Sequence, residues 1–263
     1  MYGNESFGRR LRLSGLARRG GSGLLLVPLD HAVTTGPLGI GGDLDSLVER
    51  LAEHGADSVV VHKGAARRIR PGRFRELGLI VQLNASTTMA ADPDAKFPVA
   101  TVEEALRLGA HGVSLQVNAA SLTEAAQIAH LAGVAEACDR WSVPLLAMMY
   151  VRGPAVRDGR APALVAHAVQ VAAELGADLV KTALPDDEEA TARILAQAGV
   201  PVLAAGGVPR PDPDAVLGRM AAAMRAGAAG VAVGRAVFTA ADPAAMVRRL
   251  ATIVHDRAPV AVR

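Results

Sequence analysis

One lysine stands out as a candidate for chemistry: Lys181, in the stretch DLVKT at residues 178–182. The chain has only three lysines among its 28 basic residues. An amine held among apolar side chains is costly to keep charged, and its neutral form can attack a ketone to give a Schiff base. Arginine stays charged and cannot do this. The alternative is a rim lysine whose charge reaches water. Lys63, in VVVHKG, is the rival, with a substrate-clamping or a structural role equally open.

Three other side chains end apolar runs and can move or hold protons. Asp30 and His31 follow LLLVPL, and Tyr150 ends PLLAMMY. A carboxylate or a tyrosine hydroxyl beside an amine can shuttle protons. Each residue also has a structural interpretation: Asp30 as a helix cap, His31 as a packed histidine and Tyr150 as core. The residue types alone leave these alternatives open.

Two glycine-containing stretches near the carboxyl end of the chain suggest an anion site. Gly206 and Gly207 lie in AAGGVPR, and Gly234 and Arg235 lie in VAVGRAVF. Glycine lets backbone N–H groups approach a phosphate closely, and an arginine adds a charge-assisted hydrogen bond. The alternative is that these are ordinary turn glycines. Their place after the seventh and eighth predicted strands favours phosphate binding.

Short apolar runs alternate with helical patterns from residue 24 onward, and the runs predict eight strands. They are Leu24–Leu29, Ser58–His62, Leu79–Leu83, Gly112–Val117, Pro144–Tyr150, Asp178–Thr182, Pro201–Ala205 and Gly230–Gly234. Nearly continuous apolar runs are typical of parallel strands that are covered on both faces. Eight strand–helix units in this length predict an α/β fold, a TIM (β/α)8 barrel spanning residues 24–263 after an N-terminal extension at 1–23. An open doubly wound sheet is the alternative.

Composition narrows the function classes. A formal charge of +2 with scattered arginines does not indicate nucleic acid binding, and no apolar run has membrane-spanning length. The single cysteine, Cys138, excludes an internal disulfide and is typical of a reducing cytoplasm, where we expect the protein. The seven histidines show no metal-binding spacing, and no GxGxxG follows the first strand. We therefore expect neither a metal nor another cofactor.

Several stretches together resemble one family: VPLDHAVTTGP, MMYVRG, DLVKT, AAGG and GRAVFTAADP, in this order along residues 24–250. They are similar to the DhnA-type class I aldolases, which are (β/α)8 barrels. The resemblance implies that Lys181 is the Schiff-base lysine, Tyr150 the acid/base tyrosine and Asp30 the proton-relay carboxylate. His31, Lys63, Arg152 and the Gly206, Gly207, Gly234 and Arg235 group are the substrate-binding candidates, because of their places at the ends of predicted strands. The resemblance also implies a homo-oligomer, with a decamer as one form.

The chain departs from the family pattern at several positions. The usual DHG reads Asp30-His31-Ala32, the usual YPRG contains Val151, and Met148 stands where sugar-bisphosphate aldolases tend to have tryptophan. Gln82 and Gln116 replace frequent histidines. We expect an aldolase that joins dihydroxyacetone phosphate, or another ketose-phosphate donor, to a small aldehyde, with aspartate semialdehyde favoured. The alternatives are a transaldolase-like 2-amino-3,7-dideoxy-D-threo-hept-6-ulosonate synthase, a fructose-bisphosphate aldolase, a thiolase-like acyl transferase and a non-catalytic sugar-phosphate binder.

Overall fold

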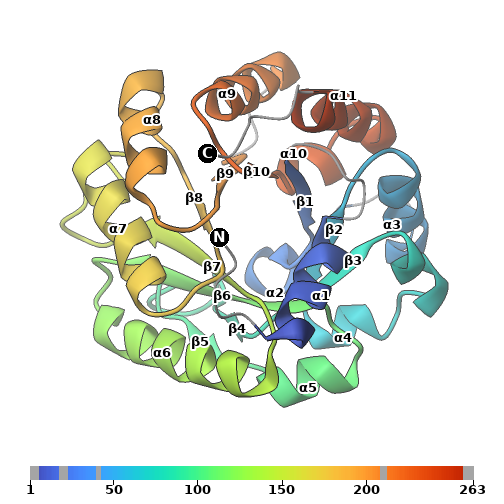
Figure 1. Cartoon of the computed structure of the whole chain (residues 1–263), viewed down its shortest axis with the longest axis horizontal. Helices are drawn as coiled ribbons and strands as arrows, with labels where there is room; N and C mark the ends of the chain where they lie inside the picture. Colours follow the sequence, from blue (N-terminus) through green and yellow to red (C-terminus); the bar gives the residue numbers. More distant parts are fainter. Residues whose placement is uncertain (1–5, 18–22, 40–42, 208–211, 257–263) are drawn as a thin grey trace.

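The computed structural model describes residues 6–17, 23–39, 43–207 and 212–256. Eight parallel strands within these residues close into a barrel in the order β1-β10-β9-β8-β7-β6-β3-β2 (Figure 1). The strands are β1 (Leu24–Pro28), β2 (Ser58–Val61), β3 (Gly78–Gln82), β6 (Gly112–Ala119), β7 (Leu145–Val151), β8 (Leu179–Thr182), β9 (Val202–Ala205) and β10 (Gly230–Ala232). The predicted TIM barrel and its eight strands are confirmed, with ends that differ by one or two residues.

Helices surround the strand ring. They are α2 (His31–Thr35), α3 (Leu44–Glu53), α4 (Lys63–Ala66), α5 (Val102–Arg107), α6 (Glu124–Trp141), α7 (Pro162–Glu174), α8 (Glu188–Gln197), α9 (Pro213–Arg225), α10 (Arg235–Phe238) and α11 (Pro243–His255), with a 3₁₀ turn η1 at Pro71–Arg75. A glycine lies at five of the joints between a helix and the next strand. Gly55, Gly109, Gly176, Gly199 and Gly227 all have positive φ, which ends each helix and turns the chain into the next strand.

The inner face of the barrel is apolar toward the amino-terminal ends of the strands. A cluster there includes Leu26, Ile80, Leu146 and Leu203, and its members alternate along each strand with residues that face the helices. Helix α1 (Phe7–Leu16), from the predicted extension, covers this end of the barrel. Its Leu16 belongs to the same cluster. The barrel is therefore filled by a packed core at the amino-terminal ends of its strands, which leaves the carboxyl ends for a functional site.

The inner face of β3 and β6 is polar toward the carboxyl ends of these strands. Gln82 Nε2 donates to Asn84 Oδ1 at 2.9 Å, and Asn84 Nδ2 donates to the Gln116 carbonyl at 2.8 Å. Gln116 Nε2 then donates to Asn118 Oδ1 at 2.8 Å. The ladder leads up to a short antiparallel hairpin, β4 (Asn84–Ala85) with β5 (Phe97–Pro98), that the sequence did not predict. Amide partners within the ladder satisfy the polar groups that this half of the barrel buries.

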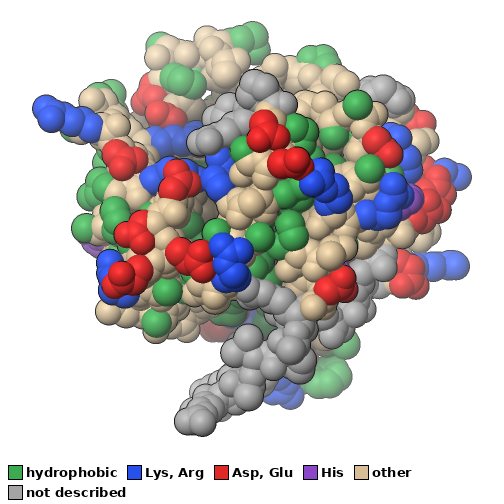
Figure 2. All heavy atoms as spheres, turned by 90° about the horizontal axis from the view of Figure 1, so that it is seen from above, with side chains coloured by type: hydrophobic (Ala, Val, Ile, Leu, Met, Phe, Trp, Pro, Cys, Tyr) green, Lys and Arg blue, Asp and Glu red, His purple; other side chains and the backbone are tan. Residues whose placement is uncertain are grey.

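The outer surface carries both signs of charge. On the face shown in Figure 2, basic and acidic side chains are interspersed rather than gathered by sign. No helix in the described part of the chain is long and apolar enough to cross a membrane. The polar residues inside the barrel thus lie at the carboxyl ends of the strands, where a TIM barrel carries its active site.

Candidate active site

Lys181 lies on β8 and faces the inside of the barrel. The residue is 6% exposed, and its Nζ lies 3.7 Å from the Met148 sulfur and 5.8 Å from the centre of the Tyr150 ring. Alternation along the strand explains the direction, because the neighbouring Val180 packs outward against the helices. Among the described residues, no carboxylate oxygen lies within 4.0 Å of this amine. The structure therefore places a buried amine beside a thioether and an aromatic face.

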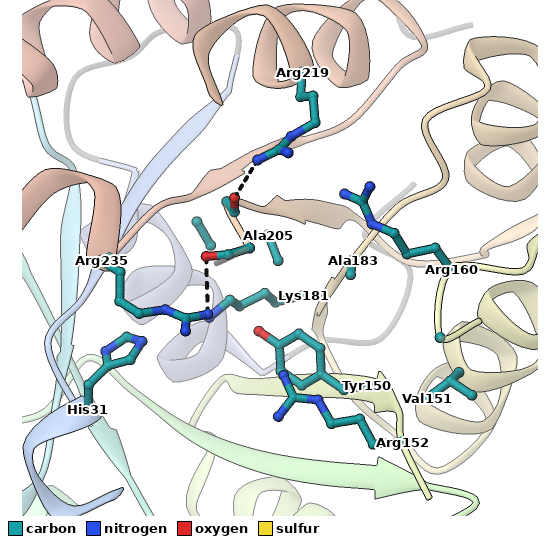
Figure 3. Close-up of a pocket in the computed structure, with 15 residues that line it drawn as sticks. His31, Tyr150, Val151, Arg152, Arg160, Lys181, Ala183, Ala205, Arg219 and Arg235 are labelled. Carbon is teal, nitrogen blue, oxygen red and sulfur yellow. Dashed lines mark hydrogen bonds between the residues drawn. The ribbon is translucent and has the colours of Figure 1, made fainter. Parts of the chain in front are cut away.

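Tyr150 and Arg152 come from the neighbouring strand β7 and the residue just beyond it. Strand register pairs Met148 with Lys181, so Tyr150 lies two residues further toward the mouth on the same inner face. The Arg152 guanidinium carbon lies 4.7 Å from the Tyr150 ring centre, within cation–π distance. Figure 3 shows Tyr150 and Lys181 extending into one cavity from adjacent strands. Tyr150 therefore packs against the inner core of the barrel and also lines the cavity beside the amine.

Asp30 and His31 lie where β1 leads into α2. The Asp30 carboxylate makes no side-chain capping bond to the helix, so the helix-cap interpretation does not hold. Its Oδ1 instead lies 3.4 Å from His31 Nδ1. Burial lowers the pKa of His31, partly offset by the Asp30 charge, and His31 packs edge-on against Phe238 at 5.3 Å between ring centres. His31 lines the cavity, whereas Asp30 lies beside it and does not.

The cavity has a volume of about 460 Å³ and a one-sided charge. Its charged lining residues are all basic: Arg152, Arg160, Lys181, Arg219 and Arg235. No aspartate or glutamate lines it among the described residues. Low-dielectric walls that carry one sign of charge raise the local concentration of ions of the opposite sign. The cavity is therefore suited to an anionic substrate.

The residues of the predicted phosphate-binding site lie together at the ends of β9 and β10. Gly206, Gly207, Gly234 and Arg235 all line the cavity. Arg235 Nη2 donates to the Gly207 carbonyl at 3.1 Å, a bond that ties the two loops together (Figure 3). Gly207 has φ +76°, and a Cβ on Gly234 would lie 2.3 Å from the Pro28 carbonyl oxygen. Both positions therefore require glycine.

Two of the cavity arginines were missed by sequence reasoning. Arg219 reaches back from α9 and donates to the Gly206 carbonyl at 2.9 Å. Arg160 follows β7 and pairs with Asp186 at 2.7 Å while it also lines the cavity. Arg160 could have been found, because it lies in a loop at the carboxyl end of a predicted strand. No sequence signal distinguishes Arg219 from the other helix arginines.

Lys63, predicted as a substrate-binding residue, lies outside the cavity. It opens α4, and its Nζ lies 3.1 Å from Glu104 Oε1 and 3.2 Å from Oε2. An ammonium that already has a carboxylate partner gains little from a second anion. The structural alternative for Lys63 is the better one.

Comparison with known proteins assigns the family. The model of the DeoC/LacD family of aldolases matches residues 24–240, which spans the whole barrel and every residue of the cavity. The chain belongs to this aldolase family. The resemblance to DhnA-type aldolases is confirmed, and the protein is a class I aldolase of the Schiff-base type.

Curated relatives of this aldolase include two synthases. A 2-amino-4,5-dihydroxy-6-oxo-7-(phosphonooxy)heptanoate synthase from Streptomyces griseus is 52% identical over 97% of this chain and 93% of its own length. A 2-amino-3,7-dideoxy-D-threo-hept-6-ulosonate synthase from Halobacterium salinarum is 43% identical over 89% of this chain and 88% of its own. Both relatives are named for amino-bearing heptanoate or heptulosonate products.

Solved structures similar to this aldolase share the barrel and the lysine chemistry. An archaeal fructose 1,6-bisphosphate aldolase superposes with a TM-score of 0.85 at 30% identity, covering 95% of this chain and 100% of that one. Another archaeal structure (TM-score 0.84, 31% identity, covering 94% and 99%) has its catalytic lysine covalently bound to a carbinolamine intermediate. The relatives and similar structures thus include both synthases and sugar-bisphosphate aldolases. They leave the substrates to be argued from the site.

Proposed function

We propose that the protein joins dihydroxyacetone phosphate to aspartate semialdehyde through a Schiff base on Lys181. One observation carries the proposal: a buried amine beside a tyrosine in a cavity whose charged lining residues are all basic. A phosphorylated ketone satisfies both features, because its carbonyl needs the amine and its phosphate needs the cations.

The first half of the reaction builds a nucleophile from the donor. The Lys181 amine attacks the ketone carbonyl, and loss of water gives an iminium that withdraws electrons from the neighbouring carbon. Removal of a proton from the hydroxymethyl carbon then gives an enamine. Tyr150 is the proposed proton carrier, because it extends into the cavity next to the amine. Asp30, beside His31, is the proposed relay behind it.

The second half uses the enamine to make the carbon–carbon bond. The enamine carbon attacks the aldehyde carbon, and the aldehyde oxygen takes a proton to become a hydroxyl. Water adds to the regenerated iminium, and the product ketone leaves as Lys181 returns to the free amine. The balance needs no oxidant or reductant, so the reaction requires only the groups in the cavity and water.

The donor phosphate is proposed to sit between the β9 and β10 loops. Gly206, Gly207 and Gly234 give access to backbone N–H groups, and Arg235 supplies a guanidinium held in place by the Gly207 carbonyl. Arg219 and Arg160 extend the same cationic wall. The phosphate would thus fix the ketone carbonyl over Lys181.

Two features favour aspartate semialdehyde as the acceptor. The 52% identical relative is named for a product with an amino acid at one end and a phosphate at the other. Met148, packed against Lys181, is a flexible thioether where a fixed indole would fill the pocket. The finer alternatives are the transaldolase-like synthase, whose donor is a sugar phosphate, and the sugar-bisphosphate aldolase. The transaldolase-like synthase differs from the proposed enzyme in its donor. The sugar-bisphosphate aldolase differs in its acceptor, which is glyceraldehyde 3-phosphate.

Borohydride trapping tests the chemistry. Reduction in the presence of dihydroxyacetone phosphate should add the reduced donor to the peptide that contains Lys181, and Lys181→Arg should abolish the adduct. Labelling at Lys63 or Lys96 instead, or none with any ketose phosphate, would overturn the assignment. The acceptor is tested by kcat/KM for aspartate semialdehyde against glyceraldehyde 3-phosphate with the same donor. A tenfold preference for the sugar phosphate, about 1.4 kcal/mol, would make the protein a sugar-bisphosphate aldolase.

A further inference from the structure

The small hairpin holds the third lysine, Lys96, near the carboxyl end of β3, and Lys96 is not one of the residues that line the cavity. Lys96 comes directly before β5, whose pairing with β4 turns the chain back over the polar side of the barrel. Its Nζ donates to the Ser86 hydroxyl at 2.8 Å, and Ser86 is fully buried. That hydroxyl in turn donates to the Pro93 carbonyl at 2.6 Å. The amine is therefore fixed at its far end and does not extend freely into water.

Hydrogen bonds from β6 and α6 hold the segment that carries Lys96 against the barrel. Asn118 Nδ2 and Gln127 Nε2 each donate to the Asp94 carbonyl at 2.9 Å. Asn118 is the last amide of the buried ladder on β3 and β6, and Gln127 is a buried residue of α6. Both amides are buried, and their two hydrogen bonds to one carbonyl hold the loop in a fixed position relative to the barrel.

The charge of Lys96 lacks a carboxylate partner. Among the described residues, no carboxylate oxygen lies within 4.0 Å of its Nζ, in contrast to Lys63, which pairs with Glu104. Burial lowers the pKa of Lys96; the charges of Asp30 and Asp94, both beyond ion-pair distance, oppose this shift, and the charge of Arg152 adds to it. A partly buried ammonium with only a hydroxyl acceptor is poorly solvated, so an anion that binds there gains a strong charge-assisted bond.

The position of this cation around the ring is the deciding geometry. In the closed order of strands, β9 and β10 lie opposite β3 and β6. The phosphate loops follow the first pair, and the Lys96 hairpin follows β3. Lys181 on β8 and Tyr150 on β7 lie between the two ends on one side of the ring. A substrate that carries one anion at each end of its chain could thus span the mouth across Lys181.

We propose that Lys96 binds the carboxylate of the acceptor aldehyde and so selects aldehydes that carry an anionic group. The proposal rests on the proposed function, because it assigns the second end of the same site. Arg152 lines the cavity next to Tyr150, and its charge acts on Lys96, which itself is not one of the lining residues. The new carbon–carbon bond then forms between two anchored anions, phosphate on one side and carboxylate on the other.

Three aldehydes that differ by one group test the assignment. Aspartate semialdehyde carries both an ammonium and a carboxylate, succinic semialdehyde lacks the ammonium, and 3-aminopropanal lacks the carboxylate. With dihydroxyacetone phosphate as donor, Lys96→Met should raise KM about tenfold to hundredfold for the two carboxylates. The effect on 3-aminopropanal should be far smaller. Lys96→Arg, which keeps the cation but cannot form a Schiff base, should recover most of the loss.

Lys63→Met is the matched control, because it removes the same group from a lysine that already pairs with Glu104. It should leave KM for all three aldehydes near the parent value. An equal loss for 3-aminopropanal in Lys96→Met, or no rescue by arginine, would overturn the proposal. Borohydride trapping at Lys181 in each variant shows that the barrel is folded and the donor bound; Lys96→Gln replaces a variant that fails this check.

The design also separates this inference from the proposed function. If the parent enzyme traps the donor but does not use aspartate semialdehyde, the proposed acceptor is wrong. The Lys96 assignment is then decided by glyceraldehyde 3-phosphate against unphosphorylated glyceraldehyde. A loss confined to the charged aldehyde in Lys96→Met would keep Lys96 as an anion anchor, and an equal loss for both would end the assignment.

Discussion

Replacing Arg235 by alanine tests the phosphate end of the cavity most directly. Arg235 is half-buried at the start of α10, and burial lowers its pKa, with the charge of Arg152 adding to the effect. One of its N–H groups donates to the Gly207 carbonyl at 3.1 Å, which leaves other donors of the guanidinium for a ligand. The substitution should therefore remove a direct contact and also untie the two glycine loops.

The size of the effect follows from one charge-assisted bond. Loss of a hydrogen bond to a charged group costs about 1.5–3 kcal/mol, which corresponds to an increase in KM of about 10- to 150-fold. The upper end applies if the guanidinium holds two phosphate oxygens at once. Arg235→Lys should fall between alanine and the parent, because an ammonium keeps the charge without the planar fork.

The assay compares dihydroxyacetone phosphate with unphosphorylated dihydroxyacetone. KM should rise for the phosphorylated donor in Arg235→Ala, while the already weak use of dihydroxyacetone should change little. Arg225→Ala is the control, since Arg225 lies outside the cavity in an exposed pair with Glu188 at 2.9 Å. An unchanged KM for the phosphorylated donor, or an equal loss with both donors, would refute a phosphate site at Arg235.

Three other outcomes can be checked. Gly234→Ala would place a Cβ 2.3 Å from the Pro28 carbonyl oxygen, so urea unfolding should show a loss of about 1–3 kcal/mol. Gly133→Ala, in α6 with nothing within 4 Å of the added atom, should instead gain about 0.5–1 kcal/mol; a loss in both variants would contradict the packing argument. Burial lowers the pKa of His62 below its ordinary 6.5, with the Asp30 charge opposing. The unfolded chain therefore binds the proton more readily than the folded chain. The free energy of unfolding is not reduced by His62 above pH 6.5, and it decreases as the pH falls from 6.5 to the pKa of the folded state. Tm measured from about pH 5 to 8 should show this slope, and His62→Gln should reduce it; an unreduced slope would exclude His62 as a source. Light scattering at micromolar concentration should give a homo-oligomer, with the decamer as the form that the family resemblance implies, and a monomer would contradict this.

Local patterns were sufficient for the barrel and for the middle of the site. The eight apolar runs predicted eight strands because parallel strands covered on both faces need continuous apolar sequence. Glycines with positive φ at the helix ends are a local signal of the same kind, because a positive φ after a helix favours glycine. Lys181 and Tyr150 were placed at the mouth because each lies at the carboxyl end of a strand, where a TIM barrel keeps its chemistry. These signals depend on a few neighbouring residues only.

Contacts between distant segments decided the rest. Lys63 and Lys96 both carry one positive charge, and both follow predicted strands in the sequence. Only the folded chain shows that Glu104, 41 residues further on, neutralises the first, while the second rests on a buried hydroxyl. Arg219 enters the cavity for the same kind of reason, since α9 packs so that its side chain reaches the Gly206 carbonyl.

The sequence by itself therefore determined the fold, the family and the strand-end position of the candidate amine, because strand periodicity and strand ends are local properties of the chain. The tertiary structure alone decided which cations remain available to a substrate and on which side of the mouth each one lies. Availability depends on the solvation and on the partners of a charge, and both are set by residues brought together from distant parts of the barrel.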